Sequence, residues 1–291
     1  MFTPLTVGVL GAGTMGTGIA VVCARAGHRT IVRDVDDAAV GAGIERVTGF
    51  LDKSAQLGKL PADRAEESKR LLNGTTALED LAGCDVVIEA VFEDVALKQR
   101  TFGALDEICK PDTLFHTNTS TLPVTAIGAG SVRPERVVGT HYCNPAPMMT
   151  LVEVAKGHRT GEEPYRRTLE FLRGVGKTTV TTKDSPGFIV NRFLIPWENN
   201  CIRALEAGLG TVESIDAAVT NALGHPMGPF TLLDIVGLDI HKAVATSLYE
   251  QLKDPRFAPP PMVDRMVAAG ELGRKTGRGF HTYDSTRLFG T

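Results

Sequence analysis

The fold of this chain is decided by the stretch Val7-Gly8-Val9-Leu10-Gly11-Ala12-Gly13-Thr14-Met15-Gly16. A short apolar run leads into the pattern G-x-G-x-x-G, and a helical pattern follows it. In such a unit Gly11 permits the tight turn, Gly13 lets the backbone approach a pyrophosphate, and Gly16 allows close packing of helix on strand. The stretch therefore predicts a dinucleotide-binding loop, consisting of Gly11, Ala12, Gly13, Thr14, Met15 and Gly16.

An acidic residue, Asp34, closes the next predicted strand 23 residues beyond Gly11. A carboxylate at this position binds the adenosine ribose hydroxyls and repels a 2′-phosphate, which favours NAD over NADP. Arg33 keeps NADP open as an alternative, because a nearby arginine can accommodate that phosphate. FAD uses the same turn, but the acid–base pair described below favours a nicotinamide cofactor.

Strands and helices alternate through the first two-thirds of the chain. Short β-branched runs predict strands at Leu5–Leu10, Arg29–Arg33, Asp85–Val91, Thr113–His116 and Arg136–Tyr142. Longer patterns predict helices at Met15–Ala26, Ala38–Leu57, Val95–Cys109 and Val124–Ala129. Near-continuous apolar strands are typical of a parallel sheet covered on both faces. The predicted fold class is therefore α/β, a Rossmann-type doubly wound sheet.

A composition change near residue 184 divides the chain into two predicted domains. Before it, strands at Leu151–Ala155 and Thr178–Thr182 flank a helix at Glu163–Arg173. After it, Ser185 as N-cap and Pro186 at the first helical position predict a long helix through Ala207. Further helices are predicted at Val212–Leu223, Phe230–Leu252 and Met262–Ala269. We expect an NAD-binding domain at 1–184 and an all-helical C-terminal domain at 185–291.

Bulk properties exclude several classes of protein. The formal charge is −3 with both signs interspersed, so we expect no nucleic-acid partner. No apolar run approaches the roughly 20 residues of a membrane span, and the start lacks the basic region of a signal peptide. The five cysteines are scattered without a CxxC pair, which indicates reduced thiols, a cytoplasmic location and no metal site.

One imidazole and one carboxylate stand beside two of the predicted strands. His141 closes the strand Arg136–Tyr142, and Glu153 lies 12 residues further on. A histidine titrates near neutral pH and can move a hydroxyl proton, and a neighbouring carboxylate can fix its tautomer. Ligands of open α/β sheets bind at the carboxyl ends of strands, where Ser120 also lies. Taken alone, the pair is compatible with a structural as well as a catalytic role.

The chain resembles the L-3-hydroxyacyl-CoA dehydrogenases, most closely the stand-alone bacterial branch that acts on 3-hydroxybutyryl-CoA. The resemblance covers nearly the whole length in the family's order and spacing. The matching segments are GAGTMGTGIA at 11–20, EAVFEDVALK at 89–98, NTST at 118–121, HYCNPAPMMTLVEV at 141–154, DSPGFIVNR at 184–192, GHPMGPFTLLDIVGLD at 224–239 and GRKTGRGF at 273–280.

This resemblance implies an oxidoreductase that interconverts (S)-3-hydroxyacyl-CoA and 3-ketoacyl-CoA with NAD, in fatty-acid or butanoate metabolism. It implies that His141 is the catalytic base, that Glu153 orients it, and that Ser120 and Asn191 surround the reacting hydroxyl and the nicotinamide. The remaining residues that it implies are Glu93, Lys98, Ser120 and Lys275 as NAD contacts, and Lys53, Lys59, Ser120 and Asn191 as contacts of the acyl-CoA substrate. It also implies a homodimer through the C-terminal helical domain.

Alternative interpretations remain for the protein and for single residues. The runner-up function is an NAD-dependent non-CoA hydroxyacid dehydrogenase on the same scaffold. A different class, a catalytically silent NAD-binding or structural protein, is disfavoured because all four polar residues of the expected site are present: His141, Glu153, Ser120 and Asn191. Ser120 alone could be the N-cap of the following helix, Asn191 could cap or bridge helices, and Lys98 could be a solvated surface residue.

Overall fold

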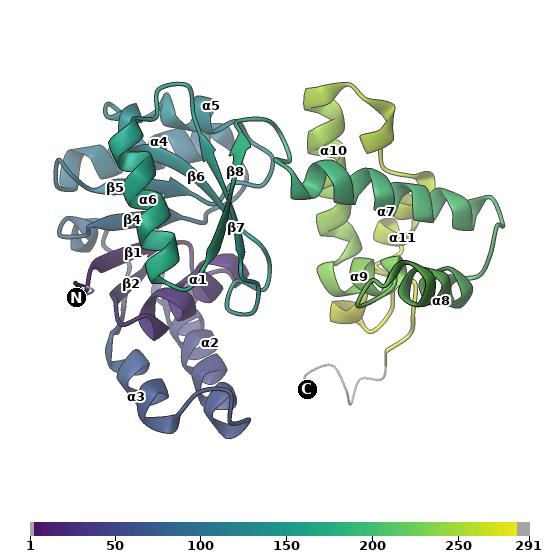
Figure 1. Cartoon of the computed structure of the whole chain (residues 1–291), viewed down its shortest axis with the longest axis horizontal. Helices are drawn as coiled ribbons and strands as arrows, with labels where there is room; N and C mark the ends of the chain where they lie inside the picture. The colour runs from purple at the N-terminus through teal and green to yellow at the C-terminus, as the bar shows by residue number, and fades with distance from the viewer. Residues whose placement is uncertain (1–2, 284–291) are drawn as a thin grey trace. The chain divides into compact units, whose positions relative to one another are not determined.

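The chain consists of two compact units in the computed structural model, which describes residues 3–283 (Figure 1). The first unit extends to Phe188 and the second begins at Ile189. The first holds one eight-stranded sheet with helices on both faces, and the described part of the second is built from helices. The predicted fold class, a Rossmann-type sheet followed by a helical part, is confirmed.

The sheet has the strand order β3-β2-β1-β4-β5-β6-β7-β8. Its strands are β1 (Thr6–Leu10), β2 (Arg29–Arg33), β3 (Leu72–Thr75), β4 (Val86–Glu89), β5 (Leu114–Thr117), β6 (Val137–Tyr142), β7 (Leu151–Lys156) and β8 (Thr178–Lys183). Neighbouring strands from β3 to β6 pair in parallel, whereas β6 and β7 pair antiparallel and β7 and β8 again in parallel. The last two strands therefore run against the other six. The short connection 143–150 explains the reversal, because parallel neighbours need a crossover of a dozen or more residues.

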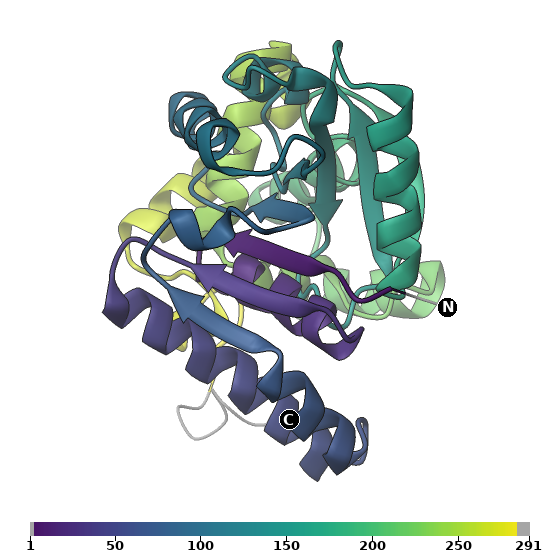
Figure 2. The same ribbon diagram turned by 90° about the vertical axis from the view of Figure 1, so that its left-hand side faces the viewer.

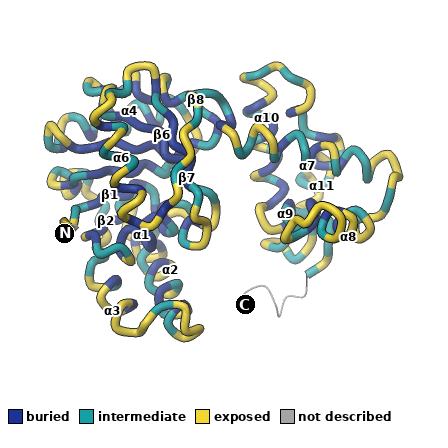
Figure 3. Tube along the Cα trace, viewed as in Figure 1, coloured by how far each residue is buried: buried dark blue, intermediate teal, exposed yellow. Residues whose placement is uncertain are grey.

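The first unit has two hydrophobic cores, one on each face of the sheet. Helices cover both faces (Figure 2), and the central strands are buried (Figure 3). The helices α1 (Thr14–Arg25), α2 (Asp37–Gln56) and α6 (Glu162–Gly174) pack on one face, and α4 (Val95–Ile108) and α5 (Val124–Gly128) on the other. Strand β4 shows the alternation: Val86 and Ile88 belong to the first core and Val87 to the second. Both faces of the central strands are apolar for this reason.

Two elements of the first unit were absent from the sequence prediction. Helix α3 (Ala62–Arg70) and strand β3 lie between β2 and the segment that leads to β4. Strand β3 has the sequence LNGT and is only half buried at the sheet edge. Asn and Gly are depleted in strands, so its sequence carries no strand signal.

The helix predicted to start at Ser185 and Pro186 is wrong in its first turn. The helix α7 begins at Val190 and ends at Glu206. Gly187 has φ 79° and Phe188 has φ 46°, and neither left-handed conformation can continue a right-handed helix. Ser185 instead accepts a hydrogen bond from the Phe188 N–H in a turn.

The predicted helix Phe230–Leu252 is two helices. They are α9 (Pro229–Val236) and α10 (Leu238–Leu252), separated by Gly237 with φ 102°. The other helices of this unit are α8 (Val212–Leu223) and α11 (Pro261–Ala268). Over residues 3–283 no helix is long and apolar enough to cross a membrane, and no group of three or more His, Cys, Asp or Glu is placed to hold a metal ion.

A buried polar cluster joins α7 to α10 in the second unit. His241 on α10 contacts Glu198 through Nδ1 and the Asn199 side-chain oxygen through Nε2, each at 3.0 Å. The Asn199 amide donates in turn to the backbone carbonyls of Arg256 and Ala258. All three side chains of the cluster are buried. Each therefore depends on the others for its hydrogen bonds.

We predict that His241→Leu destabilises the protein by about 3–5 kcal/mol, because it leaves the buried Glu198 carboxylate without its partner. Urea unfolding followed by circular dichroism measures the loss. His225→Leu, at an exposed histidine of the same unit, is the matched control and should change stability by less than about 0.5 kcal/mol. Equal effects of the two substitutions would contradict the role assigned to the cluster.

Candidate active site

The sheet register places His141 directly opposite Glu153. The two residues are paired positions of the antiparallel strands β6 and β7, so their side chains point to the same face. His141 Nδ1 lies 2.7 Å from Glu153 Oε2. His141 is 7% exposed and Glu153 is 1% exposed. The pair that the sequence left ambiguous is thus a buried, hydrogen-bonded imidazole and carboxylate.

The contact with Glu153 fixes the tautomer of His141. A carboxylate only accepts hydrogen bonds, so the proton must be on Nδ1, and Nε2 of the neutral ring carries the lone pair. Nε2 makes no hydrogen bond within residues 3–283. The Phe188 ring lies 5.8 Å from the imidazole, centroid to centroid, and is itself buried. The site therefore offers one orientated proton acceptor against an apolar wall.

Neighbouring residues hold the ends of β6 and β7 in place. The Tyr142 N–H donates to the Asn118 side-chain oxygen at 2.9 Å, which ties the end of β6 to the end of β5. In the connection between β6 and β7, Lys177 Nζ donates to the carbonyls of Ala146 at 2.6 Å and Met149 at 2.7 Å. The backbone around the His141–Glu153 pair is consequently fixed on both sides.

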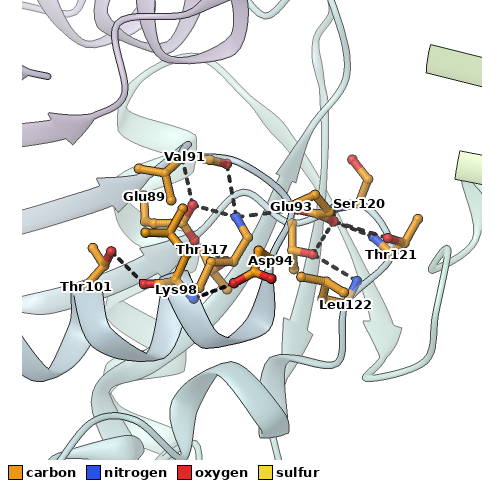
Figure 4. Close-up of polar contacts among 12 residues, drawn as sticks. Glu89, Val91, Glu93, Asp94, Lys98, Thr101, Thr117, Ser120, Thr121 and Leu122 are labelled. Carbon is orange, nitrogen blue, oxygen red and sulfur yellow. Dashed lines mark hydrogen bonds and ion pairs between the residues drawn. The ribbon is translucent and has the colours of Figure 1, made fainter. Parts of the chain in front are cut away.

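The loop that carries Ser120 is held by a single carboxylate. Glu93 Oε1 accepts hydrogen bonds from the Thr119 hydroxyl at 2.6 Å, the Ser120 N–H at 2.8 Å and the Thr121 N–H at 2.9 Å. The Ser120 hydroxyl points away from this cluster (Figure 4). The N-cap of α5 is Pro123, so the alternative role of Ser120 as the cap of that helix is wrong.

Lys98 lies between two carboxylates, the buried Glu89 and the more exposed Glu93 (Figure 4). Its Nζ lies 2.5 Å from Glu89 Oε1 and 3.4 Å from Glu93 Oε2, and the residue is 1% exposed. Glu89 also accepts from the Thr117 hydroxyl at 2.7 Å and the Val91 N–H at 2.8 Å. The alternative of a solvated surface lysine is therefore wrong. The network ties the ends of β4 and β5 to α4.

Burial and charge oppose each other in this network. Burial by itself raises the pKa of Glu93, but the Lys98 charge and the hydrogen bonds from the Thr119–Thr121 loop outweigh it, so the pKa is lowered from 4.5. A carboxyl group whose pKa is lowered by folding stabilises the folded state at any pH above its pKa in the unfolded chain. This stabilisation is lost as the pH falls through the pKa of the folded state. Burial raises the pKa of Glu89, with Lys98 opposing it. The Glu93 carboxylate is therefore ionised at neutral pH and holds the Thr119–Thr121 loop there.

The glycine loop has the geometry that a pyrophosphate requires. Gly11 has φ 96°, and a Cβ on Gly16 would clash with the Gly11 carbonyl oxygen. A Cβ on Gly13 would meet nothing within 4 Å, so this backbone borders open space. Gly13 is also the N-cap of α1 and provides no side-chain cap, which leaves the first N–H groups of the helix available to an anion.

Asp34 lies beside this loop at the end of β2. Its carboxylate accepts from the Ala12 N–H at 2.6 Å and from the Val35 N–H at 2.7 Å. A carboxylate has about four acceptor sites, so two backbone contacts leave room for ribose hydroxyls. Arg33 Nε donates to the Thr76 carbonyl at 3.2 Å. Asp34 and the glycine loop thus form one preorganised unit.

Comparison with known proteins agrees with this geometry. Residues 6–185 match the domain described as 3-hydroxyacyl-CoA dehydrogenase, NAD binding domain, and residues 187–283 match the C-terminal domain of the same family. The chain belongs to the 3-hydroxyacyl-CoA dehydrogenase family. It is an oxidoreductase, and its cofactor is NAD.

Several relatives are similar to this dehydrogenase over almost their whole length. A 3-hydroxybutyryl-CoA dehydrogenase of Mycobacterium tuberculosis is 44% identical over 279 residues, which are 95% of this chain and 98% of the relative. One from Bradyrhizobium diazoefficiens is 40% identical and covers 95% of this chain and 94% of its own. The crystal structure of (S)-3-hydroxybutyryl-CoA dehydrogenase from Ralstonia eutropha superposes with a TM-score of 0.90 at 38% identity, covering 97% of this chain and 100% of the other.

Four of the residues predicted for the dehydrogenase site lie outside the groups described so far. Asn191 is the second residue of α7 in the second unit, and the N-cap of that helix is Ile189. Lys275, also in the second unit, forms an ion pair with Asp239 at 2.5 Å. Lys53 and Lys59 lie exposed on and after α2. Their assigned contacts stay predictions.

Two residues of the dehydrogenase site were missed by the sequence analysis. Phe188 was placed inside a helix, although the Pro186–Gly187 dipeptide is a turn signal that could have corrected this. Glu89 was read only as part of an apolar strand. A carboxylate that ends a buried strand in the run VVIE needs a partner, and this is the signal that could have drawn attention to it.

We predict that Lys98→Met destabilises the dehydrogenase by about 3–5 kcal/mol, because it leaves the Glu89 carboxylate buried and uncompensated. The double variant Lys98→Met/Glu89→Gln removes that charge and should recover at least half of the loss in urea unfolding. Arg166→Met removes an exposed ion pair with Glu170 and serves as the control, with little expected change. A double variant no more stable than Lys98→Met would contradict the network.

Proposed function

We propose that this dehydrogenase interconverts (S)-3-hydroxyacyl-CoA and 3-ketoacyl-CoA thioesters. Its preferred substrate is the short-chain thioester 3-hydroxybutyryl-CoA. The observation that carries the proposal is the 2.7 Å contact between His141 Nδ1 and Glu153 Oε2 at paired strand positions. The names of the relatives from Mycobacterium tuberculosis and Bradyrhizobium diazoefficiens support the short acyl chain.

His141 is the proposed catalytic acid–base. In the oxidative direction neutral Nε2 accepts the proton of the 3-hydroxyl group, and in the reductive direction the imidazolium returns it to the 3-keto oxygen. Glu153 accepts from Nδ1–H throughout and stabilises the imidazolium. Ser120, whose hydroxyl points away from the Glu93 anchor, binds the reacting oxygen or the thioester carbonyl. Asn191 of the second unit is assigned to the same task by family resemblance.

The residues present fit NAD. The open backbone at Gly13 and the uncapped N-terminus of α1 would hold the pyrophosphate, and Asp34 would hold the adenosine ribose. Glu93 and Lys98, which hold the loop of Ser120, are proposed as further NAD contacts, and so is Lys275 of the second unit. When bound, NAD accepts or returns the hydride at C3.

We predict that His141→Gln lowers kcat for acetoacetyl-CoA reduction by about 10²–10⁴-fold, because the proton donor is lost while the rest of the site stays. Initial rates of NADH oxidation measure this, and fluorescence titration should show NADH affinity within twofold of the wild type. The matched control is His158→Gln, at an exposed histidine of the same unit. Turnover of His141→Gln near that of the control would refute the assignment.

Asp34 is the proposed determinant of cofactor choice. We predict that Asp34→Ala raises KM for NADH about tenfold and reduces the preference for NADH over NADPH. The variant lacks the carboxylate that binds the ribose hydroxyls and repels a 2′-phosphate. Arg33 is turned to the Thr76 carbonyl and is not assigned to a phosphate. Steady-state rates with both cofactors test this. An unchanged ratio of kcat/KM for the two cofactors would contradict it.

The runner-up substrate class, free hydroxyacids, is tested in the same assay. Initial rates with 3-ketoacyl-CoA substrates of different chain lengths, compared with rates with free 3-keto acids, separate the two classes.

We also propose a homodimer through the helical domain, a place in β-oxidation or butanoate metabolism, and a cytoplasmic location. The dimer is supported by large apolar side chains left exposed on the second unit, such as Phe193, Ile235 and Ile240.

A further inference from the structure

The hydrogen bond to Glu153 does not by itself fix the plane of the His141 imidazole. It places Nδ1 at 2.7 Å from Glu153 Oε2, but a hydrogen bond keeps most of its strength over about 30° of misalignment. The torsion that turns a histidine ring about its Cβ–Cγ bond has broad minima and does not fix the plane either. The Nε2 lone pair lies in the ring plane. A second contact must therefore set the direction in which this lone pair points.

The Phe188 ring supplies this second contact. Its centroid lies 5.8 Å from that of the imidazole, and the two ring planes are tilted by 44°. Aromatic rings at such distances favour tilted arrangements, because the edge of one ring meets the face of the other. Phe188 is 4% exposed and belongs to the same hydrophobic core as Val124 and Ala155. Since such cores are close-packed, the Phe188 ring holds its place and limits the rotation of the imidazole.

The backbone of Phe188 has a conformation that phenylalanine rarely adopts. Its φ is 46°, in the left-handed region where the Cβ crowds a carbonyl oxygen. Within residues 3–283 the one other non-glycine residue with a positive φ is Lys253, the exposed C-cap of α10. Helix ends are a usual place for this conformation. Phe188 is buried and precedes a helix, so that explanation does not apply to it.

This strained position indicates that the Phe188 ring has a function. Glycine adopts the left-handed conformation without strain, as Gly187 does with φ 79°. The chain nevertheless has a phenylalanine at the next position, which costs backbone energy. Strained residues cluster at functional sites, where the surrounding structure maintains them. Here the strained residue is the one whose ring packs on the imidazole of the proposed acid–base.

The segment that carries Phe188 is fastened at both ends. Asp184 accepts hydrogen bonds from the Val124 N–H at 2.7 Å, the Thr125 N–H at 2.8 Å and the Thr125 hydroxyl at 2.5 Å. These contacts hold the chain just after β8 against the first turn of α5. At the other end the Phe188 N–H donates to the Ser185 carbonyl at 3.0 Å. The ring is therefore presented to the imidazole from a fixed backbone.

We propose that Phe188 is a positioning residue of the reaction, whose ring fixes the plane of the His141 imidazole and so aims Nε2 at the reacting oxygen. The proposal rests on the proposed function, in which His141 moves the proton of the substrate hydroxyl. Glu153 and Phe188 have separate tasks, because the carboxylate selects the tautomer and the ring sets the orientation. The rate depends on this orientation, since a misplacement of about 1 Å can cost about 10²-fold.

Kinetics of Phe188→Ala and Phe188→Leu test the proposal, with Phe171→Ala and Phe171→Leu as matched controls. Phe171 is also 4% exposed, but it lies on α6 in the core on the other face of the sheet. We expect Phe188→Ala to lower kcat for acetoacetyl-CoA reduction about 10²-fold and to leave KM for NADH unchanged. Phe188→Leu still fills most of the space beside the imidazole, so it should fold and recover most of this loss.

The Phe171 variants should lose as much stability in urea as the Phe188 variants, because they leave cavities of the same size. They should keep the kcat of the wild type, since the imidazole of His141 is untouched. Equal kcat in the Phe188 and Phe171 variants would overturn the proposal.

Phe188→Gly separates the ring from the backbone strain. Glycine relieves the left-handed conformation, so this variant should unfold at a higher urea concentration than Phe188→Ala. It lacks the ring just as Phe188→Ala does, so its kcat should be no higher. A kcat that rose together with stability from the alanine to the glycine variant would mean that Phe188 acts on the stability of the fold alone. That result would contradict a positioning role.

Carbon-13 relaxation of the His141 imidazole measures the orientation of the ring without turnover. His141→Gln assigns the resonance, because it lacks that signal. The order parameter of the ring should be about 0.85 in the wild type and in Phe171→Leu, and below about 0.6 in Phe188→Ala. Phe188→Leu should lie between them. An order parameter that is the same in all four proteins would overturn the proposal.

The two measurements separate this proposal from the proposed function. If the imidazole loosens in Phe188→Ala but the wild type does not oxidise NADH with acetoacetyl-CoA, the positioning role stands and the proposed function fails. If acetoacetyl-CoA is reduced and Phe188→Ala changes neither kcat nor the order parameter, the proposed function stands and the positioning role fails.

Discussion

The antiparallel pairing of β6 and β7 is the constraint on which the candidate active site depends. In a fully parallel sheet the strand after β6 would follow a crossover of a dozen or more residues, so a residue only 12 positions after His141 could not lie opposite it. The short return instead makes residues 12 apart in sequence direct neighbours across two strands. A shift of the register by one residue would move Glu153 to the opposite face of the sheet. The pair is thus positioned by backbone hydrogen bonds and not by loop contacts.

The loop that carries Ser120 is positioned by charged side chains, of which Lys98 and Glu89 are buried. Ser120 lies on a loop, which has no register of its own, and Glu93 supplies the missing constraint by accepting from three consecutive residues. Glu93 is in turn held near Lys98, which is fixed by Glu89 at the end of β4. Sites whose orientating groups are themselves locked keep their geometry through the reaction. The loop is therefore fixed to the sheet through three charged side chains in contact, Glu89, Lys98 and Glu93.

Sequence alone predicted the parts of this structure that follow from local patterns. The glycine loop, the alternation of strands and helices, and the approximate bounds of β1, β2 and β6 depend on apolar periodicity and turn chemistry, which are local. Strand β3, with the sequence LNGT, has no such pattern and forms because β2 offers an edge. The break at Gly237 and the turn at Phe188 depend on single φ angles, to which periodicity is insensitive. The Glu89–Lys98 contact joins residues nine apart on a strand and a helix, and only the packed fold reveals it.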